Sequence, residues 1–262
     1  MAALRPIYLV GHNTNSIAEI EDGLARGLNA FEIDINKDEH DELFVSHGPV
    51  NGATALVTGP CPRLVPFLLE LKRLVSSPAG SKIALVIFDC KISDPALAVE
   101  LVDAVRTCLT GAGSSLPVIY SVPALSDART FFEPIQSGLQ PREALMIDEE
   151  GDPRAVATFF AERGVVRAAY GNGITTVLGV GLPSPRLVAQ MEEAVALAAL
   201  GFVYAWVLVA AGTMRRFLRA GVSGVMVDTS DAETLVRVLE EPEFSSQLRR
   251  ATRDDDPLAR RD

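Results

Sequence analysis

Cysteine is scarce in this chain of 262 residues, which contains only Cys61, Cys90 and Cys108. Three thiols cannot all pair with one another, and no CxxC spacing is present. The cysteines therefore indicate neither an oxidising nor a reducing compartment. Low-complexity tracts and long blocks of like charge are also absent, and the length suits one large domain as well as two small ones.

Positive charge is in short supply as well, with 24 lysines and arginines against 34 acidic residues and a formal net charge of -10. The isoelectric point from the sequence is about 4.9. A nucleic-acid partner is not expected, because no basic stripe is present to neutralise phosphate groups. An acidic protein that acts on an anionic lipid must offset the charge locally, with a metal ion and a few placed cations.

Signals for export and membrane insertion are missing too. Residues 1–6 show no charged region followed by an apolar core, so we predict no signal peptide and expect a cytoplasmic protein or a mature end. Residues 194–212 are uncharged and approach the roughly 20 apolar residues of a spanning helix. This run is rich in alanine, however, and contains Gly201, Tyr204 and Trp206. A helix end followed by a buried strand explains it better, so no transmembrane segment is predicted.

Short apolar segments alternate along the chain with amphipathic segments of helical spacing. The predicted strands cover residues 6–10, 30–35, 83–88, 118–121, 144–147, 166–170, 202–207 and 224–227, with a short added strand at 43–46. The predicted helices cover residues 16–26, 63–75, 126–132, 153–163, 185–200, 214–220 and 231–239, and another helix begins at residues 94–95.

This alternation predicts an α/β fold in which a parallel sheet closes into a (β/α)8 TIM barrel, as a single domain over residues 1–262. The alternative is a doubly wound open sheet. No glycine-rich dinucleotide fingerprint follows the first strand, so the barrel is favoured.

The predicted strand of residues 31–35 organises the sequence, because it carries Glu32 and Asp34 one position apart. Alternate side chains of a strand share a face, so both acids point to one side and their apolar neighbours point to the other. Two carboxylates on the inner face of an apolar strand repel each other, and a divalent cation would relieve that repulsion. A half-exposed strand with one polar face is the commoner alternative.

The ends of neighbouring strands favour a functional site over that alternative. His12 ends the first strand, Asp89 and Lys91 end the strand that follows the two acids, and His47 follows the short added strand. The active site of a TIM barrel lies at the carboxyl ends of its strands, so we expect these side chains at one mouth of the barrel. Their joint placement indicates a site rather than separate structural residues.

The residue types indicate the chemistry of this site. Glu32, Asp34 and Asp89 offer hard oxygen ligands, which suit Mg2+ or Ca2+ and not zinc. His12 and His47 lie outside this ligand set and would act as nucleophile and general acid/base, because imidazole titrates near neutral pH. The lysine would neutralise a phosphoryl oxygen. The sequence therefore predicts a phosphodiester site.

Several motifs of the chain combine into a known pattern. They are Gly11-His12-Asn13-Thr14-Asn15-Ser16-Ile17-Ala18, Gly27-Leu28-Asn29-Ala30-Phe31-Glu32-Ile33-Asp34, His47-Gly48, Phe88-Asp89-Cys90-Lys91, Gly173-Ile174-Thr175, Tyr204-Ala205-Trp206, Gly221-Val222-Ser223-Gly224-Val225-Met226 and Ala251-Thr252-Arg253-Asp254-Asp255-Asp256-Pro257. The pattern resembles the phospholipase D toxins of recluse spiders, also called sphingomyelinases D, which have bacterial and fungal relatives.

The resemblance implies a TIM barrel distantly related to glycerophosphodiester phosphodiesterases, with Mg2+ held by the three acids. It implies His12 as nucleophile, His47 as general acid/base and Lys91 as a phosphate contact. Family members expel the alcohol head group from sphingomyelin or lysophospholipids, many by attack of the substrate's own hydroxyl, which gives a cyclic phosphate. The positions expected to bind substrate are Lys91, Tyr170, Trp206 and Asp228, the last of which stands where the family usually has asparagine.

The resemblance also implies that residues 240–262 plug the bottom of the barrel, and that the protein is a secreted monomer acting at a membrane or micelle surface. The chain departs from the family at two places. The residues after His47-Gly48 lack the family's disulfide-closed Cys-Asp-Cys element, so the acid that supports His47 is missing or replaced. Val209 stands where an acid is expected after the tryptophan.

These departures leave the reaction type intact and open the question of the substrate. One alternative is a glycerophosphodiester phosphodiesterase that acts on deacylated substrates. The other is a catalytically silent barrel that binds lipid head groups. Both histidines and all three acids are present, which favours an enzyme.

Overall fold

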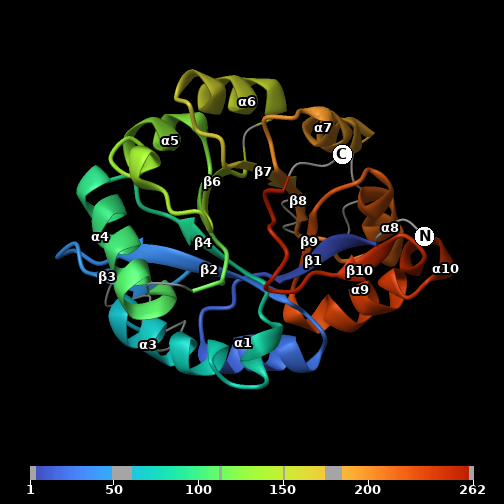
Figure 1. Ribbon diagram of the computed structural model, residues 1–262, viewed down its shortest axis with the longest axis horizontal. Coiled ribbons are helices and arrows are strands. Elements are labelled where there is room, and N and C mark those ends of the chain that lie inside the picture. The colour runs from blue at the N-terminus through green and yellow to red at the C-terminus, as the bar shows by residue number, and fades with distance from the viewer. Residues whose placement is uncertain (1–3, 49–60, 112–113, 150, 175–184, 260–262) are drawn as a thin grey trace.

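A closed barrel of eight parallel strands lies at the centre of the protein, and helices form a ring around it (Figure 1). The structure is a computed structural model that describes residues 4–48, 61–111, 114–149, 151–174 and 185–259. β1 pairs with both β2 and β9, which closes the barrel and confirms the predicted TIM-barrel fold. Its strands in order are β1 (Arg5–Gly11), β2 (Ala30–Lys37), β4 (Leu85–Cys90), β5 (Val118–Val122), β6 (Glu143–Ile147), β7 (Ala168–Gly173), β8 (Phe202–Trp206) and β9 (Gly224–Val227).

Helices follow the strands along the chain and cover the outside of the barrel. They are α1 (Ile17–Ala25), α3 (Leu64–Val75), α4 (Pro95–Val105), α5 (Leu125–Phe131), α6 (Pro153–Glu162), α7 (Pro185–Ala196), α8 (Ala211–Arg219), α9 (Ala232–Leu239) and α10 (Pro242–Ser245). The short strand β3 (Leu43–Val45) runs antiparallel beside the end of β2, as predicted.

Side-chain alternation divides the core into two layers. On β2, Phe31 and Ile33 join the large apolar layer between strands and helices, whereas Ala30 belongs to the smaller cluster inside the barrel. The same alternation turns Glu32 and Asp34 inward, which is the arrangement that the sequence predicted.

Local signals in the sequence place the first helix accurately. Ser16 is the N-cap of α1: its hydroxyl oxygen accepts from the Glu19 backbone N–H at 3.3 Å, and its hydroxyl donates to the Glu19 carboxylate at 2.9 Å. These two bonds cap the helix at its start, which lies where the helix of residues 16–26 was predicted to begin. Asp94 caps α4 in the same way, by accepting from the Ala96 N–H, with Pro95 in the first turn.

Several predicted boundaries were wrong by a few residues, those of β7 and α7 among them. The strand predicted from Val166 begins at Ala168, and the Val166 side chain is 89% exposed because it lies in the connection that follows α6. The helix predicted to reach residue 200 ends at Ala196, and the uncharged run continues through a turn into β8.

Within the described residues, none of the helices has the length and apolar character needed to cross a membrane.

The C-terminal segment crosses the end of the barrel that faces the viewer in Figure 1. Its strand β10 (Leu248–Arg250) pairs with the start of β1, and the Asn29 amide donates to the Ala251 carbonyl at 2.8 Å. Ala251 and Leu258 join the apolar cluster inside the barrel. The role of residues 240–262 as a plug stays a prediction, and residues 260–262 lie outside the described part.

Asp255 holds this segment through four hydrogen bonds. Two come from the Arg249 guanidinium at 2.5 and 2.7 Å, and two come from the Thr252 hydroxyl and backbone N–H. The bonds from Arg249, partly opposed by burial, lower the pKa of Asp255 from 3.8 to about 2. A carboxylate with a depressed folded-state pKa stabilises the fold at higher pH, and this contribution is lost as the pH falls toward about 2.

Replacement of Asp255 by asparagine is therefore expected to destabilise the protein in a pH-dependent way. Near neutral pH the free energy of unfolding should fall by about 1–2 kcal/mol, because charge-assisted hydrogen bonds are lost. The loss should shrink to roughly half near pH 3, where the carboxyl group is partly protonated in the unfolded chain. Urea denaturation at both pH values measures this, with Asp254→Asn at a neighbouring exposed acid as the control. An equal loss at both pH values would contradict the assignment.

Candidate active site

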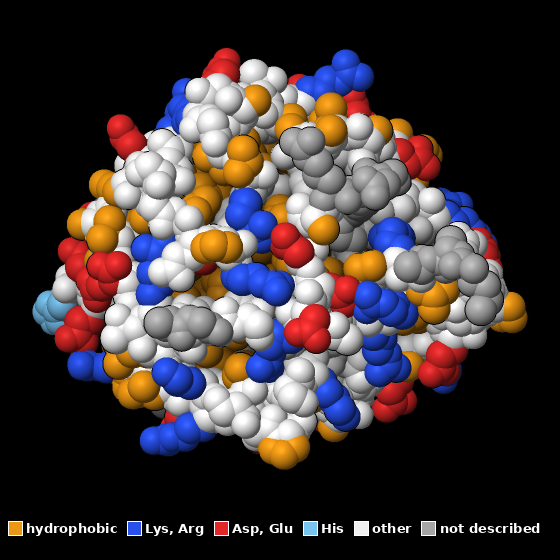
Figure 2. Space-filling view, viewed as in Figure 1, with side chains coloured by type: hydrophobic (Ala, Val, Ile, Leu, Met, Phe, Trp, Pro, Cys, Tyr) orange, Lys and Arg blue, Asp and Glu red, His pale blue; other side chains and the backbone are white. Residues whose placement is uncertain are grey.

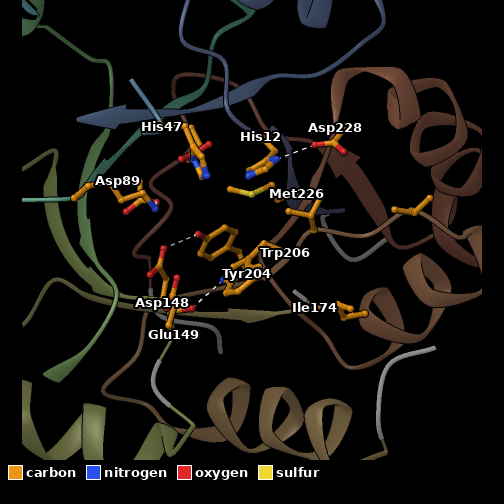
Figure 3. Close-up of a pocket in the computed structure, with 14 residues that line it drawn as sticks. His12, His47, Asp89, Asp148, Glu149, Ile174, Tyr204, Trp206, Met226 and Asp228 are labelled. Carbon is orange, nitrogen blue, oxygen red and sulfur yellow. Dashed lines mark hydrogen bonds and ion pairs between the residues drawn. The ribbon is translucent and has the colours of Figure 1, made fainter. Parts of the chain in front are cut away.

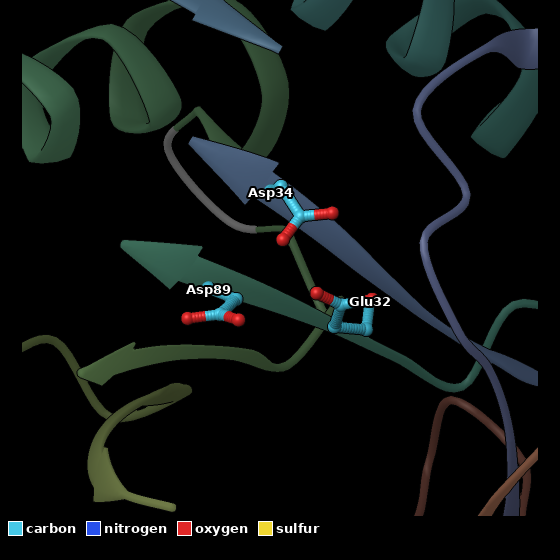
Figure 4. A group of neighbouring side chains, drawn as sticks. All are labelled: Glu32, Asp34 and Asp89. Atoms are coloured by element: carbon cyan, nitrogen blue, oxygen red, sulfur yellow. The ribbon is translucent and has the colours of Figure 1, made fainter. Parts of the chain in front are cut away.

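Three carboxylates meet inside the barrel at the carboxyl ends of two neighbouring strands. Glu32 and Asp34 come from β2, and Asp89 of β4 is the register partner of Asp34. One oxygen atom from each carboxylate lies within 4.8 Å of the other two, and all three side chains are buried. Figure 4 shows their carboxyl groups directed toward one another.

The surroundings of this triad fit a cation. Burial, followed by the charges of Asp34 and Asp89, raises the pKa of Glu32 well above its ordinary value. Burial also raises the pKa of Asp89, and its buried Oδ1 atom has no hydrogen-bond partner among the described residues. Three buried carboxylates with an unpaired oxygen form a hard-oxygen donor set, so the triad could hold a metal ion.

Neighbouring groups orient the acids. The Asn13 backbone N–H donates to Glu32 Oε2 at 2.5 Å, and the Asn15 amide donates to Asp34 Oδ2 at 2.9 Å. Both asparagines follow β1, in the first motif of the resemblance. Such outer contacts fix the direction of carboxylate oxygens and define where a cation would sit.

Lys91 places a positive charge beside the triad. Its Nζ atom forms ion pairs with Asp89 and, at 3.6 Å, with Asp34. Burial alone would lower the pKa of Lys91, but the nearby carboxylates outweigh it, and the net effect is a raised pKa. The residue therefore stays charged at neutral pH and is available to an anionic group in the same cavity.

The two predicted histidines face each other across the mouth of the barrel (Figure 3). Their ring centroids are 6.3 Å apart and the ring planes are inclined at 79°. Nδ1 of His12 lies 2.8 Å from Asp228 Oδ1, and Nδ1 of His47 lies 3.2 Å from Asp34 Oδ1. When Nδ1 carries the donated proton, the lone pair of the neutral imidazole is on Nε2, where a nucleophile or base needs it.

Asp34 resolves the question of the acid that supports His47. The hydrogen bond that His47 donates to Asp34, partly opposed by burial, raises the pKa of His47. Burial alone would raise the pKa of Asp34, but hydrogen bonds from His47 and Asn15 outweigh it and lower that pKa. The segment after Gly48 lies outside the described residues, so Asp34 is the acid that the structure places on this histidine.

The two histidines border one cavity of about 480 Å3, together with Glu32, Asp89 and Lys91. A cavity of this size accommodates a small-molecule group. Its lining residues are His12, Glu32, His47, Asp89, Lys91, Asp148, Glu149, Ile174, Tyr204, Trp206, Val207, Val209, Met226 and Asp228.

Several residues of this lining were missed in the sequence, Asp148 and Glu149 among them. Asp148 follows β6 directly, is only 6% exposed, and accepts a hydrogen bond from the Tyr204 hydroxyl at 3.1 Å. Its backbone carbonyl accepts from Trp206 Nε1 at 2.9 Å, and Glu149 comes next in the chain. The signal that could have found Asp148 is the one that found Asp89, an acid directly after an apolar strand.

Two predicted substrate contacts need revision. Tyr170 does not reach the cavity: it packs in the layer between strands and helices, because its neighbour Ala169 takes the inward position on β7. Asp228 borders the cavity but binds His12, and this hydrogen bond lowers the pKa of Asp228. Trp206 and Val209 both border the cavity.

Comparisons with known proteins agree with the motifs. A model of the family described as dermonecrotic toxin SPH matches residues 2–108 and 116–258. The dermonecrotic toxin SpeSicTox-betaIIA2i of Sicarius peruensis is 27% identical over 276 residues, which cover 95% of this chain and 98% of the toxin. SpaSicTox-betaIIA1 of Sicarius patagonicus is 27% identical over 277 residues, with the same coverage.

Solved structures share the fold. A putative glycerophosphoryl diester phosphodiesterase of Silicibacter pomeroyi superposes with a TM-score of 0.62 at 16% identity, covering 94% of this chain and 96% of that one. A glycerophosphodiester phosphodiesterase of Parabacteroides distasonis gives a TM-score of 0.63 at 14% identity, covering 90% and 98%. The match of the toxin family over nearly the whole chain shows that this protein belongs to the dermonecrotic toxin family of sphingomyelinase D-type phosphodiesterases.

Proposed function

We propose that this protein is a metal-dependent phospholipase D that removes the alcohol head group from a lysophospholipid or a sphingomyelin-like lipid. One observation carries the proposal: two histidines, each with Nδ1 on a carboxylate, face each other beside three buried acids and a charged lysine. A binding protein has no need of such a pair, whereas phosphoryl transfer needs both a nucleophile and a proton carrier.

In this proposal Glu32, Asp34 and Asp89 hold Mg2+, or Ca2+, whose preference for carboxylate oxygens they meet. When bound, the ion neutralises charge that builds up on the phosphoryl oxygens. Lys91 contacts the same phosphate group and supplies a second positive charge. These cations offset the negative charge of the cavity, which otherwise repels a phosphodiester.

His12 would attack the phosphorus atom through Nε2. Asp228 would accept the hydrogen bond from Nδ1–H, which holds the proton on Nδ1 and stabilises the positive charge that forms on the ring. His47 would donate a proton to the oxygen of the departing head group and later accept one from the attacking hydroxyl. That hydroxyl belongs to water or to the lipid itself, and the second case yields a cyclic phosphate. Both outcomes use the same pair of histidines.

The remaining parts of the proposal follow from the family. The substrate is presented at a membrane or micelle surface, the protein is a secreted monomer like a venom toxin, and the whole chain is one domain. Residues 240–262 act as the plug, for which the contacts of Asn29 and Asp255 with this segment provide support.

Comparison of two substrates tests the proposal. Phosphorus NMR of the products formed from lysophosphatidylcholine and from glycerophosphocholine reports substrate and product type together. Turnover of the lysophospholipid alone supports a phospholipase D. Faster turnover of glycerophosphocholine would favour a glycerophosphodiesterase, whose fold this protein shares. Turnover of neither substrate would favour a silent binding barrel.

The head-group pocket yields a separate prediction. Val209 cannot offset an ammonium charge, and Asp228 is engaged by His12, so neither of these two positions supplies the acid with which the family holds choline. An ion contact of this kind is typically worth about 1–3 kcal/mol, or roughly tenfold to a hundredfold in kcat/KM. We therefore expect rates on matched choline and ethanolamine lipids to differ by less than about tenfold. A choline preference above about a hundredfold that survives in Asp228→Asn would contradict this view of the pocket.

A further inference from the structure

Strands β7 and β8 approach each other unusually closely where they reach the cavity. The strands pair Gly171 with Tyr204 and Gly173 with Trp206. A methyl group built on Gly171 would overlap the Tyr204 ring, with its Cδ1 atom at 2.8 Å, and would meet Asp148 Cβ at 2.9 Å. A methyl group on Gly173 would overlap both the backbone and the indole ring of Trp206.

Real Cβ contacts do not occur at such distances, so both positions require glycine for a reason of packing. Neither glycine has a positive φ, and backbone conformation therefore does not explain them. The space that the missing side chains leave is filled by the two aromatic rings of β8. The strand register places both rings at the edge of the cavity.

Asp148, which directly follows β6, anchors the same two rings. Its carboxylate accepts the Tyr204 hydroxyl hydrogen bond, and its carbonyl accepts the Trp206 indole N–H (dashed lines in Figure 3). One residue therefore holds both rings, with its side chain and its backbone, while the glycines of β7 leave room for them. Three neighbouring strands contribute to a single arrangement.

We propose that Gly171, Gly173 and Asp148 are positioning residues that seat Tyr204 and Trp206 as one fixed wall of the cavity, against which the substrate's head group packs. The inference rests on the proposed function for the identity of the group that packs there. The seating of the rings does not depend on it. Rings that are already fixed lose less conformational entropy when the substrate binds than mobile rings would lose.

Replacement of Gly171 by alanine directly tests whether this glycine positions the Tyr204 and Trp206 rings. The added methyl group pushes both the Tyr204 ring and Asp148, so the carbonyl that holds the Trp206 N–H moves as well. Trp206 is the sole tryptophan of the chain, and its fluorescence therefore reports this movement without interference. We expect a red-shifted emission and increased quenching by acrylamide, because the indole becomes more exposed to water.

Gly171→Ala should weaken substrate binding and leave the chemical step largely unchanged. With lysophosphatidylcholine as substrate, KM in Gly171→Ala is expected to rise roughly tenfold while kcat changes by less than about threefold, as for the loss of contacts that are equal in ground and transition states. Gly212→Ala is the matched control, since a methyl group there meets nothing within 4 Å. It should leave the emission and KM unchanged.

The test separates two failures. Wild-type protein that turns over no lipid overturns the proposed function, and the emission shift remains measurable in its absence. If Gly171→Ala folds and its Trp206 emission is unchanged, the proposed positioning of the two rings is wrong. A loss of activity confined to kcat would also contradict it. If Gly171→Ala does not fold, Tyr204→Phe removes only the anchoring hydroxyl: a KM raised severalfold with unchanged emission supports the proposal, and an unchanged KM overturns it.

Discussion

Replacing either His12 or His47 by asparagine is expected to reduce kcat/KM by roughly 10³-fold or more, and the double variant should lose little beyond the single ones. General acid–base and nucleophilic groups each contribute on the order of 10²–10⁴-fold, and residues that act as a unit do not add. The structure supports a unit, because the rings face each other and each is oriented by its own carboxylate. Steady-state rates on lysophosphatidylcholine measure the effect.

His40 provides the internal control for the histidine series. Its side chain is 76% exposed beside Glu39, in the turn between β2 and β3. His40→Ala should therefore retain wild-type rates. Equal losses in His40→Ala and His12→Ala would overturn the assigned roles, and near-additive losses in the double variant would show that the two histidines act in separate steps.

Removal of divalent ions, or replacement of Glu32 by alanine, should abolish turnover while leaving the fold largely intact. Burial and, after it, the charges of Asp34 and Asp89 raise the pKa of Glu32, so three ionised carboxylates are unfavourable here without a cation. A cation that binds only the folded state also stabilises it. Mg2+ is therefore expected to raise the melting temperature of the wild-type protein and to have no such effect on Glu32→Ala, which lacks one ligand.

Thermal melts with and without Mg2+ measure this independently of activity. Glu149→Gln is the matched control, because Glu149 borders the same cavity but lies outside the triad, and it should keep the Mg2+-dependent shift. Full activity in excess chelator would overturn the metal assignment. A Mg2+-dependent shift that persists in Glu32→Ala would place the ion elsewhere.

The alternation of residues along strands explains why so much of the fold could be predicted. Apolar strands alternating with helices leave few architectures open, and a period of two sets which side chains face inward. Glu32 and Asp34 were assigned to the inner face on this basis, and both lie there. The same rule applied to β7 would have excluded Tyr170, whose neighbour Ala169 takes the inward position.

Element boundaries were less predictable. Val166 has the β-branched, apolar character of a strand residue, yet it lies in a connection and is exposed. Its intrinsic preference favours a strand, but the pairing that begins at Ala168 decides where the strand starts. Capping residues gave better boundaries, because Ser16 and Asp94 act through hydrogen bonds to residues only two or three positions away.

The sequence by itself determined the barrel, the inward direction of Glu32 and Asp34, and the arrival of His12, Asp89 and Lys91 at one mouth. Each of these follows from local periodicity and from the rule that parallel strands end at one edge. The tertiary structure alone decided which groups touch. Asp228 meets His12 across 216 positions of sequence, and Asp148 joins Tyr204 across 56. Such contacts depend on barrel closure and strand register, which bring distant residues within hydrogen-bonding distance and leave no local signal in the chain.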